Sequence, residues 1–410
     1  MKHCKRKKCY LAVMISLVSS TFAYQCNAQT PLATFNEVWH IVNEHFYAKD
    51  FNGIDWQQVG AKYKPQITNA KTLEETSRII NRMLGELRAS HTHFYTIWDV
   101  EYYALLDIFK SGTLGDAIKA MFPGGEIGYV GIGIFTKAID GKVFIKGVLG
   151  GSPADSAGLR TGDRLVSIDG QPFHPIRSFL NKTGRKTKII VQTAPDEKSV
   201  REIVINPVAI RPGEMMLTAM RNSIRNIERD GKKIGYVYVW SYAGQQYHDL
   251  LVQEVAFGRL KEADALIIDL RDGWGGANPN YLNLFHKNIP QLTMIDRNGK
   301  KVTFDFQWRK PVAMLVNEGT RSGKEILAYG FRKYGIGKVI GTRTAGAVTA
   351  GRPFLLAGGQ LLYLAVQDVF VDGERLEGVG VAPDIEVQFP IEYAHGRDPQ
   401  LERALEELSR

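Results

Sequence analysis

The feature that most limits the possible folds of this chain is an alternation of apolar strands and helices in its second half. Val312–Asn317 is an apolar run, a turn follows at Gly319, and Ser322–Tyr334 has a helical pattern. Ala265–Leu270 is a second apolar run of strand length, and it ends in the glycine-rich loop Asp272–Gly276. Strands that alternate with helices predict a mainly parallel or mixed sheet covered by helices.

Two other patterns precede this α/β region. Between residue 29 and about residue 100, apolar residues recur at helical spacing, as at Phe35, Val38 and Val42, and Thr72 to Glu75 forms a capping box. From residue 125 to about 208, short β runs such as Tyr129–Phe135 are separated by glycine and aspartate turns. We therefore expect an α/β (α+β) multidomain protein. The expected domains are a helical region at 29–124, a β domain at 125–208 and an α/β core at 209–410.

Residues 1–28 have the layout of a secretory signal peptide. Met1–Tyr10 carries five basic residues and no acid, and the apolar Leu11–Ala23 is too short to span a bilayer. All three cysteines, Cys4, Cys9 and Cys26, lie here, so the mature chain has no thiol for a disulfide, a nucleophile or a metal site. We expect an exported protein, periplasmic or secreted, in a bacterium, with no membrane span once the signal is removed. An uncleaved anchor and a lipoprotein cut before Cys26 are the alternatives.

The charge of the chain argues against a nucleic-acid partner. The formal net charge of +9 falls to +4 when the five basic residues of the signal are removed. No basic stripe with interleaved aromatic residues is present, which is the usual footprint of a nucleic-acid surface. No pattern indicates an organic cofactor or a metal.

Ser322 allows two interpretations from the residues alone. Ser322 and Glu325 fit a capping box, in which the serine is only a helix cap. A serine at a strand-to-helix turn is also presented at the sheet edge, where the following N–H groups and the helix dipole favour negative charge. Those conditions stabilise the oxyanion of an acyl transfer. The side chain of Lys324 is expected to point away from Ser322 and to lie in solvent.

Three motifs together resemble the C-terminal processing, or tail-specific, serine peptidases. They are the loop Asp269–Gly276, the turn at Ser322 and the segment Glu377–Asp384. The resemblance implies a ClpP/crotonase-like α/β peptidase core with Ser322 as the nucleophile. It also implies an oxyanion hole formed by the N–H of Gly323 and by Gly275 or Gly276. The alternative from the residues alone is a turn with no ligand, in which Asp269 and Arg271 only brace the loop as a structural pair.

The chain departs from that family at the base. Tail-specific peptidases use a lysine 25 residues after the serine, and here that position is Ala347. Tricorn-type peptidases of the same superfamily lack this lysine and use a histidine preceded by a serine, which matches Ser90 and His91. Their C-terminal glutamate matches Glu377. The resemblance thus implies that His91 is the base, oriented by Ser90 and Glu377. His93 as base, or a metal held by His91 and His93, has little support.

Gly150–Gly170 closely resembles part of a PDZ domain. In that resemblance Gly131, Ile132, Gly133 and Ile134 correspond to the loop that binds a peptide carboxylate with backbone N–H groups. The β domain is therefore expected to bind peptide C-termini or to gate the active site.

Together these features predict an exported serine endopeptidase that hydrolyses polypeptide substrates through an acyl-enzyme. It needs no cofactor, and an oligomer is possible. The alternative is a non-catalytic exported PDZ scaffold or ligand-binding protein that retains the peptidase fold. That alternative predicts that His91 lies far from Ser322.

Overall fold

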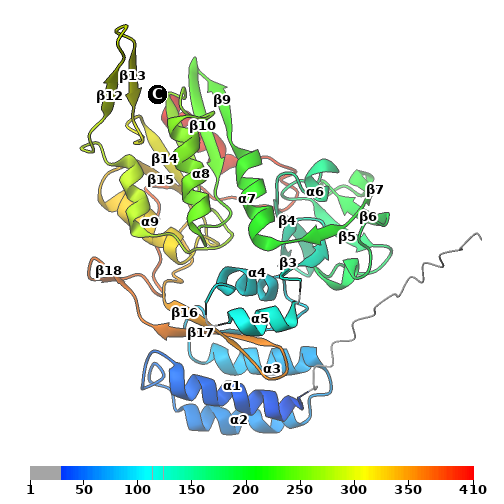
Figure 1. Cartoon of the computed structure of the whole chain (residues 1–410). Helices are drawn as coiled ribbons and strands as arrows, with labels where there is room; N and C mark the ends of the chain where they lie inside the picture. Colours follow the sequence, from blue (N-terminus) through cyan, green and yellow to red (C-terminus); the bar gives the residue numbers. More distant parts are fainter. Residues whose placement is uncertain (1–28, 113, 123) are drawn as a thin grey trace, which may run out of the picture.

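The computed structural model describes residues 29–112, 114–122 and 124–410. The expected signal peptide at residues 1–28 therefore lies outside the described residues. Figure 1 shows three parts: helices from the N-terminal region at the bottom, a β domain at the right and an α/β part at the top left. Among the helices of the described ranges, none combines the length and the apolar character needed to cross a membrane.

The N-terminal helices pack against a small sheet whose strands come from both halves of the chain. The elements are α1 (Pro31–His45), α2 (Trp56–Thr68), α3 (Leu73–Gly85), β1 (His93–Tyr95), β16 (Ala350–Leu355) and β17 (Leu361–Gln367). The sheet is antiparallel with the order β1-β17-β16. Leu362 and Leu364 of β17 are fully buried in the core formed with the three helices. The predicted cap Thr72 accepts a hydrogen bond from the N–H of Glu75 at 3.1 Å.

Two further helices, α4 (Val100–Phe109) and α5 (Gly115–Met121), lie between the N-terminal helices and the other two parts (Figure 1). Tyr102, Leu105 and Leu106 of α4 are buried, and their cluster includes Leu361 of β17. The segment between α3 and α4, which contains His91, is thereby held against the C-terminal half of the chain.

The β domain is a five-stranded antiparallel sheet with the order β3-β4-β5-β6-β7. Its elements are β3 (Ile134–Ile139), β4 (Lys142–Val148), α6 (Pro153–Ser156), β5 (Arg164–Ile168), η1 (Arg177–Phe179), β6 (Thr187–Gln192), η2 (Glu197–Ser199) and β7 (Val200–Ile205). A separate pair, β2 (Tyr129–Gly131) and β8 (Val208–Ile210), flanks it.

The predicted single run Tyr129–Phe135 is wrong in one respect, because the structure divides it into β2 and β3. Gly133 lies between these strands with φ +80°, where a Cβ would come within 2.3 Å of the Cβ of Ser152. Only glycine fits this close approach without strain.

The C-terminal half contains a six-stranded sheet with the order β20-β15-β14-β11-β10-β9. The strands are β9 (Arg225–Arg229), β10 (Lys232–Tyr238), β11 (Ala265–Asp269), β14 (Val312–Val316), β15 (Lys338–Gly341) and β20 (Ile385–Glu386). All neighbours are parallel except β9 and β10. This confirms the mixed sheet predicted from the alternating pattern.

Helices cover both faces of this sheet, as Figure 1 shows. On one face lie α7 (Pro212–Ser223), α8 (Gln245–Ala256) and α9 (Gly323–Lys333), and on the other lies α10 (Pro399–Ser409). The remaining elements are η3 (Pro279–Phe285), a hairpin of β12 (Leu292–Ile295) and β13 (Lys301–Phe304), and a short pair of β18 (Phe370–Val371) and β19 (Glu374–Arg375). β16 and β17 belong to the C-terminal half of the sequence, but they pack with the N-terminal helices. The predicted helical region and the predicted α/β core therefore share the sheet β1-β17-β16.

Candidate active site

Ser322 occupies the sharp turn between β14 and α9. Its backbone has φ 57° and ψ −132°, outside the regions that non-glycine residues prefer. Such strain at a strand-to-helix turn is typical of an exposed nucleophile, because it lifts the side chain away from the backbone. The N–H of Ser322 donates to the carbonyl of Ala347 at 2.8 Å and to Oε2 of Glu325 at 3.1 Å. These two hydrogen bonds hold the strained turn in place.

The carboxylate of Glu325 ties this turn to the loop that contains Ala347. The side chain is fully buried, and burial raises its pKa. It accepts hydrogen bonds from Oγ1 of Thr344 at 2.6 Å, from the N–H of Gly346 at 2.7 Å and from the N–H of Ala347 at 2.8 Å. The sequence interpretation of Glu325 as half of a capping box did not reveal this second role. Ala347 therefore lies directly beside Ser322, but it carries no amine.

Ser322 and His91 line the same cavity, which has a volume of about 330 Å³. His91 follows α3 and precedes β1, and its own backbone has φ 52°. His93 also contributes to the lining. The other residues that line the cavity are Ala89, Ser90, Thr92, Tyr95, Leu105, Ile108, Phe109, Ala243, Trp274, Gly275, Gly276, Arg321, Ala347 and Tyr363. The pairing of β1 with β17 and the contact of Ser90 with Thr349 hold the segment of His91 against the C-terminal half of the chain, and Ser322 bonds to Ala347 of that half.

Ser90 links His91 to the carboxylate of Glu377. Ser90 Oγ lies 2.9 Å from Nδ1 of His91 and donates to Oε2 of Glu377 at 2.8 Å. Because the hydroxyl proton of Ser90 is used toward the carboxylate, its lone pairs are left to accept Nδ1–H of His91. This arrangement fixes the tautomer in which Nε2 of His91 carries the free lone pair.

Four donors face the carboxylate of Glu377. The Ser90 hydroxyl is one, and the backbone N–H groups of Ser90 (2.7 Å), Val348 (2.7 Å) and Thr349 (3.1 Å) are the others. The carboxylate thus acts only as an acceptor. Oγ1 of Thr349 also lies 2.8 Å from Ser90 Oγ. Nothing in the sequence pattern had pointed to Thr349.

The environment of His91 keeps its imidazole neutral. Burial, together with the positive charge of Arg321, lowers the pKa of His91 to about 4, and the charge of Glu377 opposes this effect. Neutral imidazole is the form that can accept a proton. His91 is therefore ready to act as a base at any pH well above 4.

Three peptide N–H groups, two in the glycine-rich loop and one at the start of α9, have no acceptor among the described residues. Within the described ranges, the N–H groups of Gly275, Gly276 and Gly323 donate to no residue. A Cβ on Gly275 would lie 2.5 Å from the Cβ of Ser322, and a Cβ on Gly323 would lie 2.4 Å from the backbone nitrogen of Ala277. The absence of side chains therefore allows this loop to approach the serine closely. Free N–H groups in such a place can stabilise an oxyanion.

Lys324 corrects an expectation from the sequence, because its side chain is not in solvent. It is fully buried, and Nζ donates to the carbonyl of Asp272 at 2.8 Å and lies 3.4 Å from the carbonyl of Trp240. Burial lowers the pKa of Lys324 to about 7, while the charges of Asp269 and Asp272 act against this effect. The amine thus holds the start of the glycine-rich loop, and Lys324 does not line the cavity of Ser322.

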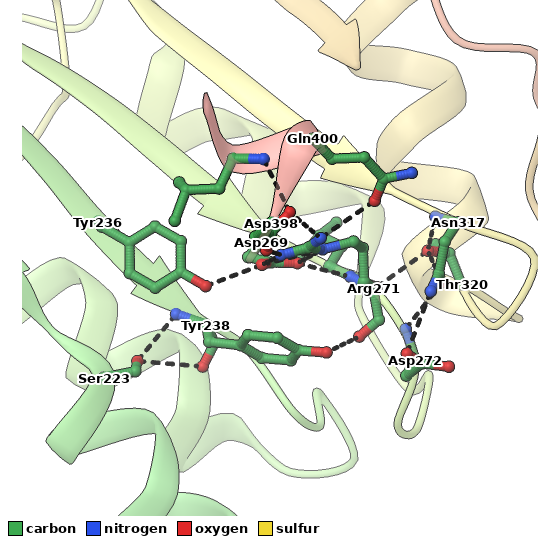
Figure 2. Close-up of polar contacts among 12 residues, drawn as sticks. Ser223, Tyr236, Tyr238, Asp269, Arg271, Asp272, Asn317, Thr320, Asp398 and Gln400 are labelled. Carbon is green, nitrogen blue, oxygen red and sulfur yellow. Dashed lines mark hydrogen bonds and ion pairs between the residues drawn. The ribbon is translucent and has the colours of Figure 1, made fainter. Parts of the chain in front are cut away.

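Figure 2 shows the ion pairs that fix the other side of this loop. Nη2 of Arg271 lies 2.5 Å from Oδ2 of Asp269 and 2.7 Å from Oδ2 of Asp398, and Nη1 donates to Gln400 at 3.0 Å. Asp269 is fully buried at the end of β11, and Asp398 caps α10. The pair of Asp269 and Arg271 therefore braces the loop, as the sequence suggested.

The expected carboxylate-binding loop lies in the β domain, away from the cavity. Gly131 ends β2 and Ile134 begins β3, while the carbonyls of Ile132 and Gly133 accept N–H groups of Ala154 and Leu149. The described residues contain no group of three metal-ligating side chains that could hold an ion.

The β domain contacts the C-terminal α/β part next to the glycine-rich loop. Nζ of Lys146 on β4 lies 3.1 Å from Oδ1 of Asp272. The ring of Phe135 stacks on Trp240 with 5.5 Å between the ring centroids. The loop that carries two of the free N–H groups is therefore in direct contact with the β domain.

The fold and this site together define an α/β serine peptidase with a PDZ-like domain. The comparisons agree: residues 233–387 match the model of peptidase family S41, residues 144–192 match a PDZ domain, and residues 28–85 match the tricorn protease C1 domain. The chain is a serine-type peptidase with a region similar to peptidase family S41.

Relatives of two kinds are similar over most of this chain. A carboxyl-terminal-processing protease of Synechocystis sp. is 25% identical over 99% of this chain and 94% of its own length. Tricorn protease homolog 1 of Streptomyces coelicolor is 26% identical over 90% of this chain, which corresponds to 34% of that protein. The chain thus spans nearly all of the first relative but about a third of the second.

Solved structures show the same fold. The tricorn protease aligns with a TM-score of 0.56 and 22% identity over 93% of this chain and 36% of that chain. The photosystem II D1 C-terminal processing protease aligns with a TM-score of 0.51 and 19% identity over 93% of this chain and 98% of that chain.

Proposed function

We propose that the protein is an exported endopeptidase that cleaves polypeptides through an acyl-enzyme, with Ser322 as nucleophile and His91 as base. The observation that carries this proposal is one cavity lined by both residues, with His91 linked through Ser90 to Glu377. A serine hydroxyl is a weak nucleophile until a base removes its proton, so such a pair is the minimum that acyl transfer needs.

In the first half of the reaction, Oγ of Ser322 attacks the scissile carbonyl carbon while Nε2 of His91 accepts the hydroxyl proton. The carbonyl oxygen becomes an oxyanion and is held by the N–H of Gly323 and by the N–H of Gly275 or Gly276. His91 then gives its proton to the leaving nitrogen, the C–N bond breaks, and an ester remains on Ser322.

In the second half, His91 removes a proton from a water molecule that attacks the ester. Ser322 regains its proton from His91 as the acid product leaves. Ser90 and Glu377 keep Nδ1–H of His91 in place throughout and stabilise the imidazolium that forms in each half-reaction. The cycle needs no group from outside the chain except water and the peptide.

The position of the lysine amines supports a histidine as the base. Ala347, beside Ser322, has no titratable group, and the amine of Lys324 is bonded to the carbonyl of Asp272. His91 is the residue of the cavity wall that combines a free lone pair with a carboxylate-backed hydrogen bond. Its low pKa makes it a weak base, so the developing imidazolium depends on Ser90 and Glu377 for stabilisation.

We also propose that the PDZ-like domain binds peptide C-termini through Gly131 to Ile134 or gates the site. The contacts of Lys146 with Asp272 and of Phe135 with Trp240 support a coupling between this domain and the loop at Gly275. The basic and apolar pattern of residues 1–28 supports export, to the periplasm or the medium.

A fluorophosphonate probe tests the site, because it labels a serine only when a neighbouring base activates it. Wild type is expected to be labelled on Ser322, whereas Ser322→Ala and His91→Ala are not. The matched control is His40→Ala, which removes an exposed histidine from α1 and should be labelled like wild type. Cleavage of an unstructured polypeptide should fall by roughly 10⁴- to 10⁶-fold in kcat for both site variants. Full labelling of His91→Ala would show that another group is the base.

A further inference from the structure

Arg321, the residue immediately before the nucleophile, presents a free cation to the active-site cavity. It lines the cavity together with Ser322 and His91. Its guanidinium forms no ion pair or hydrogen bond with any residue of the ranges that the structure describes. The turn at Ser322 is fixed by Glu325 and Ala347, so the backbone of Arg321 is held in place beside the serine.

Among the residues that the structure describes, none with a carboxylate side chain lines this cavity. Apart from Arg321, the lining consists of histidines, hydroxyl residues, glycines and apolar or aromatic side chains. The positive charge of Arg321 acts on two other residues of the cavity wall. It lowers the pKa of His91, and it acts against burial, which raises the pKa of Tyr363. Glu101 on α4 also senses this charge, but it is not part of the lining and forms no ion pair with Arg321.

A guanidinium in such a place is suited to one kind of ligand. Its planar set of N–H groups matches a carboxylate with two parallel hydrogen bonds. The rings of Phe109, Trp274 and Tyr363 form part of the same wall, while Arg321 itself is exposed and so remains open to a ligand that enters from solvent. A substrate that supplies no negative charge would leave the guanidinium without this partner.

We propose that Arg321 binds a carboxylate of the substrate near the scissile bond, and that the enzyme therefore prefers peptides with an acidic group there. This inference rests on the proposed function. The carboxylate has two possible sources, an aspartate or glutamate side chain beside the cleaved bond and the free C-terminus of a substrate cleaved close to its end.

A peptide panel of fixed sequence tests the preference and separates the two sources. One arm compares Glu with Gln at each position that flanks the cleaved bond, and the other compares a free C-terminus with an amidated one. A charge-assisted pair predicts a kcat/KM that is about 10- to 100-fold higher for the acidic peptide in one arm. Arg321→Met should reduce that ratio to about 1, and Arg321→Lys should keep part of it.

The matched control is Arg343→Met. It removes the same charge from an exposed arginine that does not line the cavity, and the ratio should stay at the wild-type value. Equal kcat/KM for acidic and amide peptides, or a preference that survives in Arg321→Met, would overturn the inference.

Binding to the Ser322→Ala protein separates this inference from the proposed function. Fluorescence anisotropy with the same labelled peptides measures the preference without turnover. One outcome is that wild type cleaves no peptide, while the Ser322→Ala protein binds acidic peptides more tightly than neutral ones and loses this preference when Arg321 is also replaced. In that case the carboxylate site stands and the endopeptidase proposal fails. If peptides are cleaved but neither binding nor kcat/KM depends on the acidic group, the endopeptidase proposal stands and the carboxylate site fails. If no peptide is cleaved and binding shows no preference, both fail.

Discussion

Replacing Lys324 with methionine tests the buried amine beneath the glycine-rich loop. The side chain is fully buried, and burial lowers its pKa from the usual 10.5 to about 7. An unfolded chain exposes the amine and restores the usual pKa. Between pH 7 and about pH 10 the unfolded state therefore binds more protons than the folded state, and the free energy of unfolding rises with pH. Methionine has a similar length and no charge, so the variant lacks this contribution.

The magnitude follows from the two pKa values. For a single group with a pKa of about 7 when folded and about 10.5 when unfolded, the free energy of unfolding increases by about 2 kcal/mol between pH 7 and pH 9. Wild type should gain this amount relative to Lys324→Met, because all other titrating groups are common to both proteins. The difference between the two proteins in free energy of unfolding, followed as a function of pH, therefore isolates the contribution of Lys324, even though each protein has its own pH dependence.

Urea denaturation at pH 7, 8 and 9, followed by tryptophan fluorescence, measures the difference. Lys338→Met is the control, since Lys338 is exposed on β15 and its loss should leave the pH dependence of wild type in place. Parallel pH profiles for wild type and Lys324→Met would refute the reasoning, because they would mean that the buried amine stays protonated across this range. In the same variant, kcat should fall by about 10- to 100-fold, because the carbonyl of Asp272 loses its donor and the glycine-rich loop is less well held.

Three further results are expected. The acid limb of the pH profile of kcat/KM should lie near pH 4, because His91 must be neutral to act as a base. Below that pH, kcat/KM should fall tenfold for each pH unit. An acid limb near pH 6.5 would contradict the burial argument. Ser90→Ala should lower kcat by about 10- to 100-fold with little change in KM, because Nδ1–H of His91 loses its acceptor. Steady-state kinetics measures both constants, and an unchanged kcat would contradict this role of Ser90. Arg271→Met should reduce the free energy of unfolding by about 3–5 kcal/mol, because it leaves the charge of Asp269 fully buried without its partner. Urea denaturation measures this loss, and a loss below about 1 kcal/mol would show that the pair is unimportant.

Local patterns predicted the elements of this protein well. The strand, turn and helix around Ser322, the capped helix after Thr72 and most of the short β runs of the PDZ-like domain all depend on residues close in sequence. Periodicity, capping and turn chemistry act over a few residues, so they can be read without knowledge of the fold. The resemblance to known peptidases then indicated Ser90, His91 and Glu377 as candidate site residues. The residues alone could not indicate that these three side chains contact one another.

Tertiary structure decided which groups meet and which are removed from water. The amine of Lys324 is turned inward to the carbonyl of Asp272, although its place on the helix suggested a solvent-exposed side chain. The second role of Glu325 and the contact of Thr349 with Ser90 likewise arise where the loop after β15 crosses the turn at Ser322. Burial and long-range hydrogen bonds depend on segments that are distant in the chain, so they are properties of the folded packing. The sequence alone determined the local conformations and the chemistry available, while the fold determined the charge state and the partners of each group.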